Sequence, residues 1–380
     1  MLSSFRNPGQ SQGRSASGPI RVMLVDDSAV IRGLINRMIT PESDMEVVAS
    51  AQDGQRAIEA LTKDPSIEVI LLDIEMPVMD GLTALPKLIQ VKKDVKIVMA
   101  STLTMENAEV SMQAMKLGAV DYVPKPTSTR EISGASNFKQ ELLDKIRAVA
   151  GRVAGPASVR QKTGAVEARK SLYTRAVVLR KAQNITQKPQ VVAIGSSTGG
   201  PQALFEVLKN LRADMRLPIV LTQHMPPTFT KILAQHIQQA SGRQCAEARE
   251  GEPLAPSKIY VAPGDYHMTI DAKGSSKVIR LNQNPPENFC RPAVDPMFRS
   301  VAKAFGARAL AVVLTGMGSD GCKGGEDIVN AGGTVIAQDE ASSVVWGMPG
   351  AAATSGLCTA LLPLNQMAGY INDFVAKGMP

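Results

Sequence analysis

Residues 191–200 combine a strand-like apolar run with a serine in a glycine-rich turn. The run Val191-Val192-Ala193-Ile194 leads into Gly195-x-Ser197-x-Gly199, and a helical pattern follows. Small flanking residues let a chain turn sharply and present a hydroxyl, while the following helix N-terminus offers unpaired N–H groups to an oxyanion. The pattern makes Ser197 a candidate nucleophile, although a flexible turn or a phosphate-binding loop has the same composition.

A histidine and an aspartate follow two other strand-like runs. His224, one of three histidines in the chain, comes directly after residues 219–223, and Asp320 lies in a glycine-rich loop after residues 309–314. A hydroxyl, an imidazole and a carboxylate at the carboxyl ends of three strands make a Ser-His-Asp triad possible. The order along the chain is Ser, His, Asp, whereas an α/β-hydrolase needs Ser, Asp, His.

Acidic residues follow two strand-like runs nearer the N-terminus. Asp26 and Asp27 end the run 21–25, and Asp73 ends the run 69–72. In a doubly wound sheet these strand ends converge at the topological switch point. Crowded carboxylates repel one another, and oxygen-only ligands suit Mg²⁺. The spacing therefore predicts a cation site.

A hydroxyl and an ammonium are expected at the same sheet edge. Ser101 follows the run 96–100, and Lys125 follows the run 119–123. Each is suited to bind a phosphoryl oxygen. Any one of these polar residues alone is as well explained as a solvated loop residue, but five at matching strand ends favour a phosphoryl site.

The elements that position these residues alternate in two regions. Residues 21–147 hold five strand-like runs with helical patterns between them, which implies a parallel sheet covered on both faces. The second region begins at residue 191, with strands expected at 191–195, 219–223, 258–261, 309–314 and 334–337. Helices are expected at 138–149, 202–210 and 321–331.

Composition limits the class of protein. The net charge is +7, but residues 152–188 hold nine Lys/Arg and one acidic residue, so the basic character belongs to one segment. We interpret 1–19 as a disordered tail and 151–188 as a basic linker between domains at 20–150 and 189–380. No apolar run reaches the ~18–20 residues of a membrane span, and no targeting pattern is present, which favours the cytosol. None of the four cysteines forms a C-x-x-C pair, so we expect free thiols.

Residues 20–150 resemble the response-regulator receiver domain, through Asp-Asp-Ser at 26–28, Met76-Pro77 and Asp80-Gly81. The resemblance implies a flavodoxin-like fold with a five-stranded parallel sheet, phosphorylated at Asp73 by a chemotaxis histidine kinase. It also implies roles for other residues: Mg²⁺ held by Asp27, Asp73 and the Glu75 carbonyl with Asp26 assisting, the phosphoryl group contacted by Ser101 and Lys125, and Tyr122 as an aromatic switch.

Residues 189–380 resemble the catalytic domain of the chemotaxis protein-glutamate methylesterase family known as CheB. The matching blocks occur in one order: 194–201, 223–226, 262–265, 291–295, 314–321, 337–343 and 347–349. The family implies a doubly wound α/β methylesterase domain in a two-component system. It also implies an activity that needs no cofactor: hydrolysis of glutamyl methyl esters on methyl-accepting chemoreceptors, which releases methanol, and deamidation of receptor glutamines. It also implies site residues: Ser197 as nucleophile, His224 as base, Asp320 as orienting acid and, as our candidates for the oxyanion hole, the Thr198 and Met317 N–H groups.

Two positions depart from the family pattern. Ser196 places a second hydroxyl beside the candidate nucleophile, and Cys290 stands where related sequences often carry histidine. We expect Cys290 to be a buried structural thiol and Trp346, the single tryptophan, to serve packing.

Two other functions fit parts of the sequence. A receiver fused to a nucleic-acid-binding domain would use the basic segment 152–188, but aromatic residues are only 4% of the chain and no helix-turn-helix pattern is present. A dinucleotide-binding domain would use the turn after Ile194, which lacks the G-x-G-x-x-G spacing. We therefore expect neither nucleic acid nor a nicotinamide cofactor as a ligand.

Overall fold

The computed structural model describes residues 18–102, 104–125, 136–151, 177–181, 188–273 and 276–377. The predicted tail (1–19) and linker (151–188) fall mostly outside these residues. Within them, no helix has the length and apolar composition that crossing a membrane requires.

The N-terminal half forms one five-stranded sheet in the order β2-β1-β3-β4-β5, with every pairing parallel. Its elements are β1 (Ile20–Val25), α1 (Ala29–Ile39), β2 (Met45–Ala51), α2 (Gly54–Lys63), β3 (Val69–Asp73), α3 (Gly81–Val91), β4 (Lys96–Ser101), α4 (Met105–Leu117), β5 (Asp121–Pro124) and α6 (Ser136–Val149). The last strand begins two residues later than predicted, because Gly118 ends α4 at φ 115° and residues 119–120 lead into the strand.

Helices cover both faces of this sheet with their apolar sides. Alternate residues along the strands point to opposite faces, so Leu24 and Leu71 pack against α1 and α6, while Met23 and Ile70 pack against α2, α3 and α4. Burial of both faces explains why these strands are apolar runs without polar alternation.

The C-terminal half forms a seven-stranded parallel sheet in the order β14-β13-β12-β6-β7-β9-β8. Its strands are β6 (Val191–Ser196), β7 (Ile219–Gln223), β8 (Cys245–Glu247), β9 (Ile259–Val261), β12 (Ala309–Val313), β13 (Thr334–Gln338) and β14 (Cys358–Leu362). Its helices are α7 (Gly200–Lys209), α8 (Phe229–Ser241), α9 (Val294–Phe305), α10 (Cys322–Asn330), α11 (Gly347–Thr354) and α12 (Leu364–Lys377), with a 3-10 turn at Gly306–Arg308. The strand order reverses between β6 and β12, which is where a doubly wound sheet places its ligand site.

Sequence patterns missed three features of this half. The edge strands β8 and β14 are short or only partly buried, so neither carries a long apolar run. The antiparallel hairpin of β10 (His267–Lys273) and β11 (Ser276–Asn282) also escaped notice. Trp346 packs against the core as expected, and its indole N–H donates to the Gln338 carbonyl oxygen at 3.1 Å.

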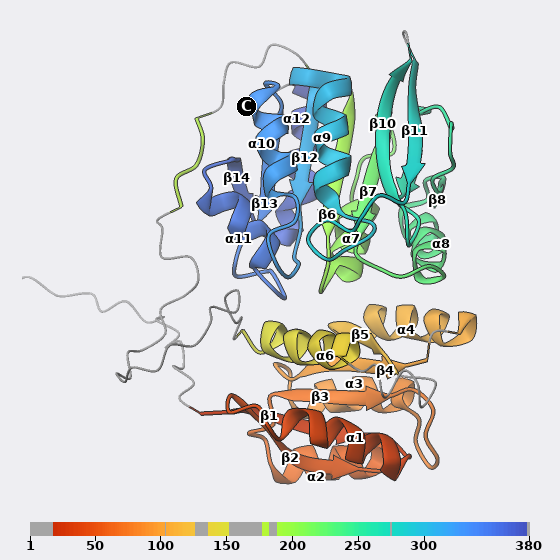
Figure 1. Ribbon diagram of the computed structural model, residues 1–380, viewed down its shortest axis with the longest axis vertical. Helices are drawn as coiled ribbons and strands as arrows, with labels where there is room; N and C mark the ends of the chain where they lie inside the picture. Colours follow the sequence, from red (N-terminus) through yellow and green to blue (C-terminus); the bar gives the residue numbers. More distant parts are fainter. Residues whose placement is uncertain are drawn as a thin grey trace, which may run out of the picture.

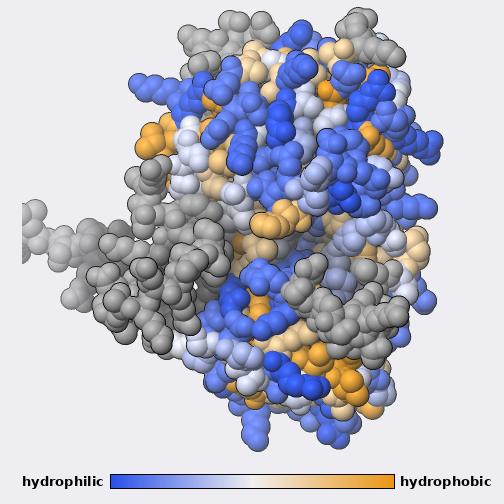
Figure 2. Space-filling model, viewed as in Figure 1, coloured by the Kyte–Doolittle hydropathy of each residue, from blue (hydrophilic) through white to orange (hydrophobic). Residues whose placement is uncertain are grey.

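The two halves are stacked with α4, β5 and α6 of the first facing the strand ends of the second (Figure 1). Tyr122 and helix α4 share one continuous apolar cluster with residues of α7 and α8, so the halves bury apolar surface against each other. On the face shown in Figure 2, hydrophilic side chains predominate and hydrophobic ones gather in small groups.

Candidate active site

Ser197 lies in a sharp turn between β6 and α7. Strand β6 ends at Ser196 and α7 begins at Gly200. Gly199 adopts φ 76°, a left-handed conformation that favours glycine. A Cβ atom at Gly195 would lie 2.5 Å from Val294 Cγ1, so that position also has no room for a side chain. The glycine spacing is therefore required by the turn.

The two neighbouring serines have different environments. Ser196 is fully buried and its hydroxyl donates to Gln223 Oε1 at 2.7 Å. Ser197 is half-buried, and its carbonyl oxygen accepts from the Gln223 side-chain amide at 2.9 Å. The structure thus engages Ser196 in the core and leaves Ser197 at the sheet edge.

His224 and Asp320 reach the same edge from the strands that flank β6. Ser196 is paired with Gln223 in the parallel register, so Ser197 and His224 leave the sheet side by side. His224 Nε2 lies 2.7 Å from Asp320 Oδ2, and both side chains are largely buried. The other imidazole nitrogen, Nδ1, is left for a third group.

Asp320 is held by five hydrogen-bond donors. They are His224 Nε2, the Asn288 side-chain amide at 2.8 Å, and the backbone N–H groups of Val294 (2.6 Å), Asp295 (2.9 Å) and Gly321 (2.9 Å). Burial alone would raise the pKa of Asp320, but the hydrogen bond and charge of His224 and the backbone donors lower it. This carboxylate is therefore ionised and fixed in orientation.

Thr198 and Met317 flank Ser197 on two loops. Gly316 packs so closely that a Cβ atom there would lie 2.8 Å from Ser197 Cβ, which brings the Met317 loop against Ser197. Neither the Thr198 nor the Met317 backbone N–H has an acceptor among the residues that the structure describes. Two such donors beside a serine are what an oxyanion requires.

The other predicted cluster lies at the carboxyl edge of the first sheet. Asp26, Asp27 and Asp73 each offer a carboxylate oxygen within 4.8 Å of the others, and Lys125 Nζ lies 2.6 Å from both Asp26 and Asp73. The single positive charge of Lys125 offsets only part of the negative charge of the three carboxylates. Burial, the largest influence, raises the pKa of Asp73 despite Lys125. The cluster is consistent with a Mg²⁺ site.

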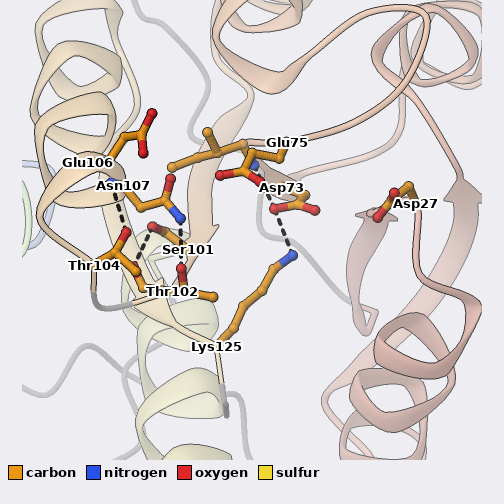
Figure 3. Close-up of a pocket in the computed structure, with 10 residues that line it drawn as sticks. Asp27, Asp73, Glu75, Ser101, Thr102, Thr104, Glu106, Asn107 and Lys125 are labelled. Carbon is orange, nitrogen blue, oxygen red and sulfur yellow. Dashed lines mark hydrogen bonds and ion pairs between the residues drawn. The ribbon is translucent and has the colours of Figure 1, made fainter.

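A pocket opens beside this cluster, and Figure 3 shows the residues that line it. Its volume is about 470 Å³. Asp27, Asp73, Glu75, Ser101 and Lys125 line it. Ser101 and Lys125 therefore lie where a group attached to Asp73 would extend.

Known proteins share both halves of the chain. The CheB methylesterase model matches residues 192–371, and the response regulator receiver domain model matches 22–137. A protein-glutamate methylesterase/protein-glutamine glutaminase 1 of Paramagnetospirillum magneticum is 54% identical over 373 residues, covering 95% of this chain and 98% of that protein. The chain belongs to the CheB methylesterase family.

Two further proteins are similar to this CheB-family chain. A protein-glutamate methylesterase/protein-glutamine glutaminase of Azospirillum brasilense is 54% identical, covering 97% of this chain and 96% of that protein. The Thermotoga maritima CheB methylesterase catalytic domain is 38% identical and covers 50% of this chain and 100% of that chain, with a TM-score of 0.48. This chain is a protein-glutamate methylesterase and protein-glutamine glutaminase of chemotaxis, regulated by a receiver domain.

The receiver of this CheB-family chain contacts the turn that carries Ser197. The Thr198 hydroxyl donates to Asp121 Oδ2 at 2.8 Å, and the Gly199 backbone N–H donates to the Val120 carbonyl oxygen at 3.2 Å. These two residues directly follow Ser197. Sequence reasoning did not identify Asp121, because a single aspartate at a strand start carries no pattern.

More contacts extend this interface along α4 and β5. The Gln202 amide donates to the carbonyl oxygens of Met115, at 2.9 Å, and Ala119. The Tyr122 ring stacks on Phe229 with centroids 4.2 Å apart and planes 11° apart. The predicted aromatic switch is thus packed against the esterase half.

Cys290 corrects an expectation from sequence. It is half-buried rather than buried, and its Sγ lies 3.4 Å from His224 Nδ1. Burial alone would lower the pKa of His224, but the charges of Cys290 and Asp320 and the hydrogen bonds to both outweigh it and raise the pKa to about 10. The Cys290 thiol therefore lies against the imidazole nitrogen that Asp320 leaves open.

Proposed function

We propose that Ser197, His224 and Asp320 form the catalytic triad of this methylesterase. The observation that carries the proposal is the bond between His224 Nε2 and Asp320. Since that bond occupies Nε2, Nδ1 is the nitrogen that would accept the Ser197 proton. A serine hydroxyl is a poor nucleophile near neutral pH without such a base.

The geometry leads to a two-stage reaction. Ser197 Oγ attacks the ester carbonyl as its proton passes to His224 Nδ1, and the Thr198 and Met317 N–H groups receive the developing oxyanion. Collapse breaks the ester C–O bond, and His224 returns the proton to the departing methanol. Water then releases the glutamate side chain from Ser197 by the same base. A receptor glutamine would follow this route and lose ammonia.

We propose Asp73 as the phosphorylation site. The residues that would hold Mg²⁺ are Asp26, Asp27, Asp73 and the Glu75 carbonyl, while Ser101 and Lys125 would contact the phosphoryl oxygens. Bound Mg²⁺ would offset the negative charge of carboxylates and phosphoryl group. A chemotaxis histidine kinase as donor, chemoreceptors as substrates and the cytosol as location complete the proposal.

We propose that the docked receiver suppresses the esterase through the turn after Ser197. Asp121 contacts Thr198, whose N–H group is one of the two proposed oxyanion donors. Val120 contacts Gly199, the next residue. The Thr198 hydroxyl, which donates to Asp121 Oδ2, and the Tyr122 ring stacked on Phe229 hold the receiver over this edge. The receiver therefore restrains the catalytic turn as well as covering it.

Phosphorylation would release this restraint through Tyr122. If Ser101 and Tyr122 move toward a phosphoryl group on Asp73, the stacking on Phe229 is lost, and an aromatic pair contributes about 0.5–1.5 kcal/mol beyond its buried area. Each 1.4 kcal/mol of weakened docking shifts the closed–open equilibrium about tenfold. At the lower end of that range, tenfold activation needs the loss of at least one neighbouring contact as well.

Methanol release from a methylated receptor fragment tests the proposal. The full chain with Mg²⁺ should respond to a small-molecule phosphodonor, and Asp73→Asn should keep the resting rate without responding. A fragment spanning 189–380 should hydrolyse the ester faster than the resting full chain without Mg²⁺. A fragment slower than the resting chain would make the receiver an activator instead.

A further inference from the structure

A tight turn next to the triad carries Cys290. The backbone N–H groups of Glu287 and Cys290 each donate to the other's carbonyl oxygen, at 3.2 and 2.9 Å. The residues between them, Asn288 and Phe289, have φ values of 52° and 63°, the left-handed pair of a two-residue hairpin turn. The Asn288 side chain also donates to Asp320 and Asp295. The turn is therefore anchored to the acid of the triad.

This turn presents the Cys290 thiol to the base of the triad. Cys290 Sγ lies 3.4 Å from His224 Nδ1, the nitrogen that the Ser197 proton must reach. Among the residues that the structure describes, His224 bonds to Asp320 and Cys290 through its ring and not to Ser197. Cys290 and Ser197 thus compete for one nitrogen atom.

Among the residues that the structure describes, the other three cysteines have no such partner. Cys245 and Cys358 are buried, and burial raises the pKa of each thiol to about 12. Cys322 is half-buried like Cys290, but its neighbours are the Ser355 hydroxyl and the Ala351 carbonyl oxygen, and burial raises its pKa. Cysteine reactivity depends on the thiolate, which an adjacent imidazolium stabilises.

We propose that Cys290 is a reactive thiol paired with His224, and that its covalent modification by a peroxide or a soft electrophile switches the esterase off. Transfer of the thiol proton to Nδ1 gives a thiolate–imidazolium pair. The inhibitory part of the inference rests on the proposed role of His224, whereas the reactivity of the thiol does not.

The oxidation balances with hydrogen peroxide as the only co-reactant. The Cys290 thiolate attacks one peroxide oxygen, an S–O bond forms and the O–O bond breaks, and the departing hydroxide takes the proton from the His224 imidazolium to leave as water. Sulfur is oxidised to a sulfenic acid and the peroxide is reduced. The larger, polar group then lies against Nδ1 and keeps the Ser197 proton from reaching it. Two equivalents of an added thiol reverse the change, forming a disulfide of the reductant and water.

Limited alkylation of the full chain with iodoacetamide tests the reactivity, with each cysteine followed by peptide mass spectrometry. Cys290 should react at least tenfold faster than Cys322, its matched half-buried control. His224→Gln should slow Cys290 and leave the Cys322 rate unchanged. Equal rates for the two thiols, or a Cys290 rate that ignores His224→Gln, would overturn the proposal.

Ester hydrolysis after peroxide treatment tests the consequence, with each protein compared with its own untreated rate. The wild-type chain and Cys322→Ala should lose activity as sulfenic acid appears at Cys290, and dithiothreitol should restore it. Cys290→Ala should keep its activity through the same treatment. Full activity with Cys290 completely oxidised would refute the inhibition. A fluorophosphonate that fails to label Ser197 in the peroxide-free chain activated with Mg²⁺ and phosphodonor would count against the triad. The alkylation rates would still decide the reactivity of Cys290.

Discussion

The proposed phosphorylation site and the proposed esterase site both lie at the carboxyl ends of central parallel strands, but they differ in how their negative charge is neutralised. Around Asp73, three carboxylates gather beside an open pocket, and the ammonium of Lys125 pairs with two of them, Asp26 and Asp73. In the esterase, Asp320 is buried and bonded to five donors. The receiver site thus has unbalanced charge for a cation and a phosphoryl group to offset, whereas the esterase site is preorganised before substrate binds.

The largest expected effect is the loss of activity when the hydroxyl of the proposed nucleophile is removed. Ser197→Ala should lower methanol release on the order of 10⁶-fold, as loss of a catalytic serine does in other triads. Ser196→Ala is the matched control: its hydroxyl bonds to Gln223 inside the core, so its loss should cost about 1 kcal/mol of stability and little activity. The reverse pattern would move the nucleophile to Ser196.

Asp320→Asn should come next, with kcat lowered about 10⁴-fold because the amide favours the wrong imidazole tautomer. Asn288→Ala should have a smaller effect, since four donors to Asp320 remain. Steady-state kinetics on a methylated receptor fragment measures both. An Asp320→Asn rate within tenfold of wild type would argue that the carboxylate only stabilises the fold.

Removal of Mg²⁺ should separate the two sites. Chelation with EDTA should abolish the increase in rate that a phosphodonor produces and leave the resting rate unchanged. In the part of the chain that the structure describes, only the receiver cluster groups three carboxylates that could hold the cation. Parallel assays with Asp73→Asn give the reference for a chain that cannot be phosphorylated. A resting rate that falls on chelation would place a metal in the esterase reaction.

The smallest effect concerns pH and the contact between Cys290 and His224. The neighbouring Cys290 and Asp320 raise the pKa of His224 to about 10 despite its burial. Cys290→Ser replaces the sulfur that contributes to this rise and should lower that pKa. Because the base must be neutral to act, the acidic limb of the kcat/KM profile should move to lower pH. On that limb, each unit by which the His224 pKa falls raises the neutral fraction of the imidazole about tenfold. An unmoved limb would show that Cys290 does not influence the base.

Sequence patterns indicated where the candidate residues lie better than what supports them. Ser197, His224 and Asp320 follow apolar strands, and glycine spacing marks the turns around them, so their common sheet edge was predictable. Their catalytic roles, which the family resemblance implied, stay a prediction. The structure confirms the expected fold, a five-stranded parallel sheet and a second α/β domain. Short edge strands such as Cys245–Glu247 have too few residues for a periodic signal.

Contacts between distant segments were beyond sequence reasoning. Asp121 meets Thr198 across 77 positions, and Cys290 meets His224 across 66. Neither Asp121 nor Cys290 stands in a local motif that predicts its partner. The first contact depends on how the two sheets stack, and the second on how the turn that carries Cys290 folds back. The expectation that Cys290 was a buried structural thiol failed for this reason.

Resting hydrolysis by interface variants of the full chain tests the central claim, that the docked receiver restrains the turn after Ser197. Asp121→Ala removes the acceptor of the Thr198 hydroxyl, and Gln202→Ala removes two docking bonds away from that turn. With Mg²⁺ but no phosphodonor, both variants should release methanol faster than wild type, about tenfold for each 1.4 kcal/mol of docking lost. The further increase on adding phosphodonor should shrink accordingly. Resting rates at or below the wild-type rate in both variants would contradict restraint by the receiver.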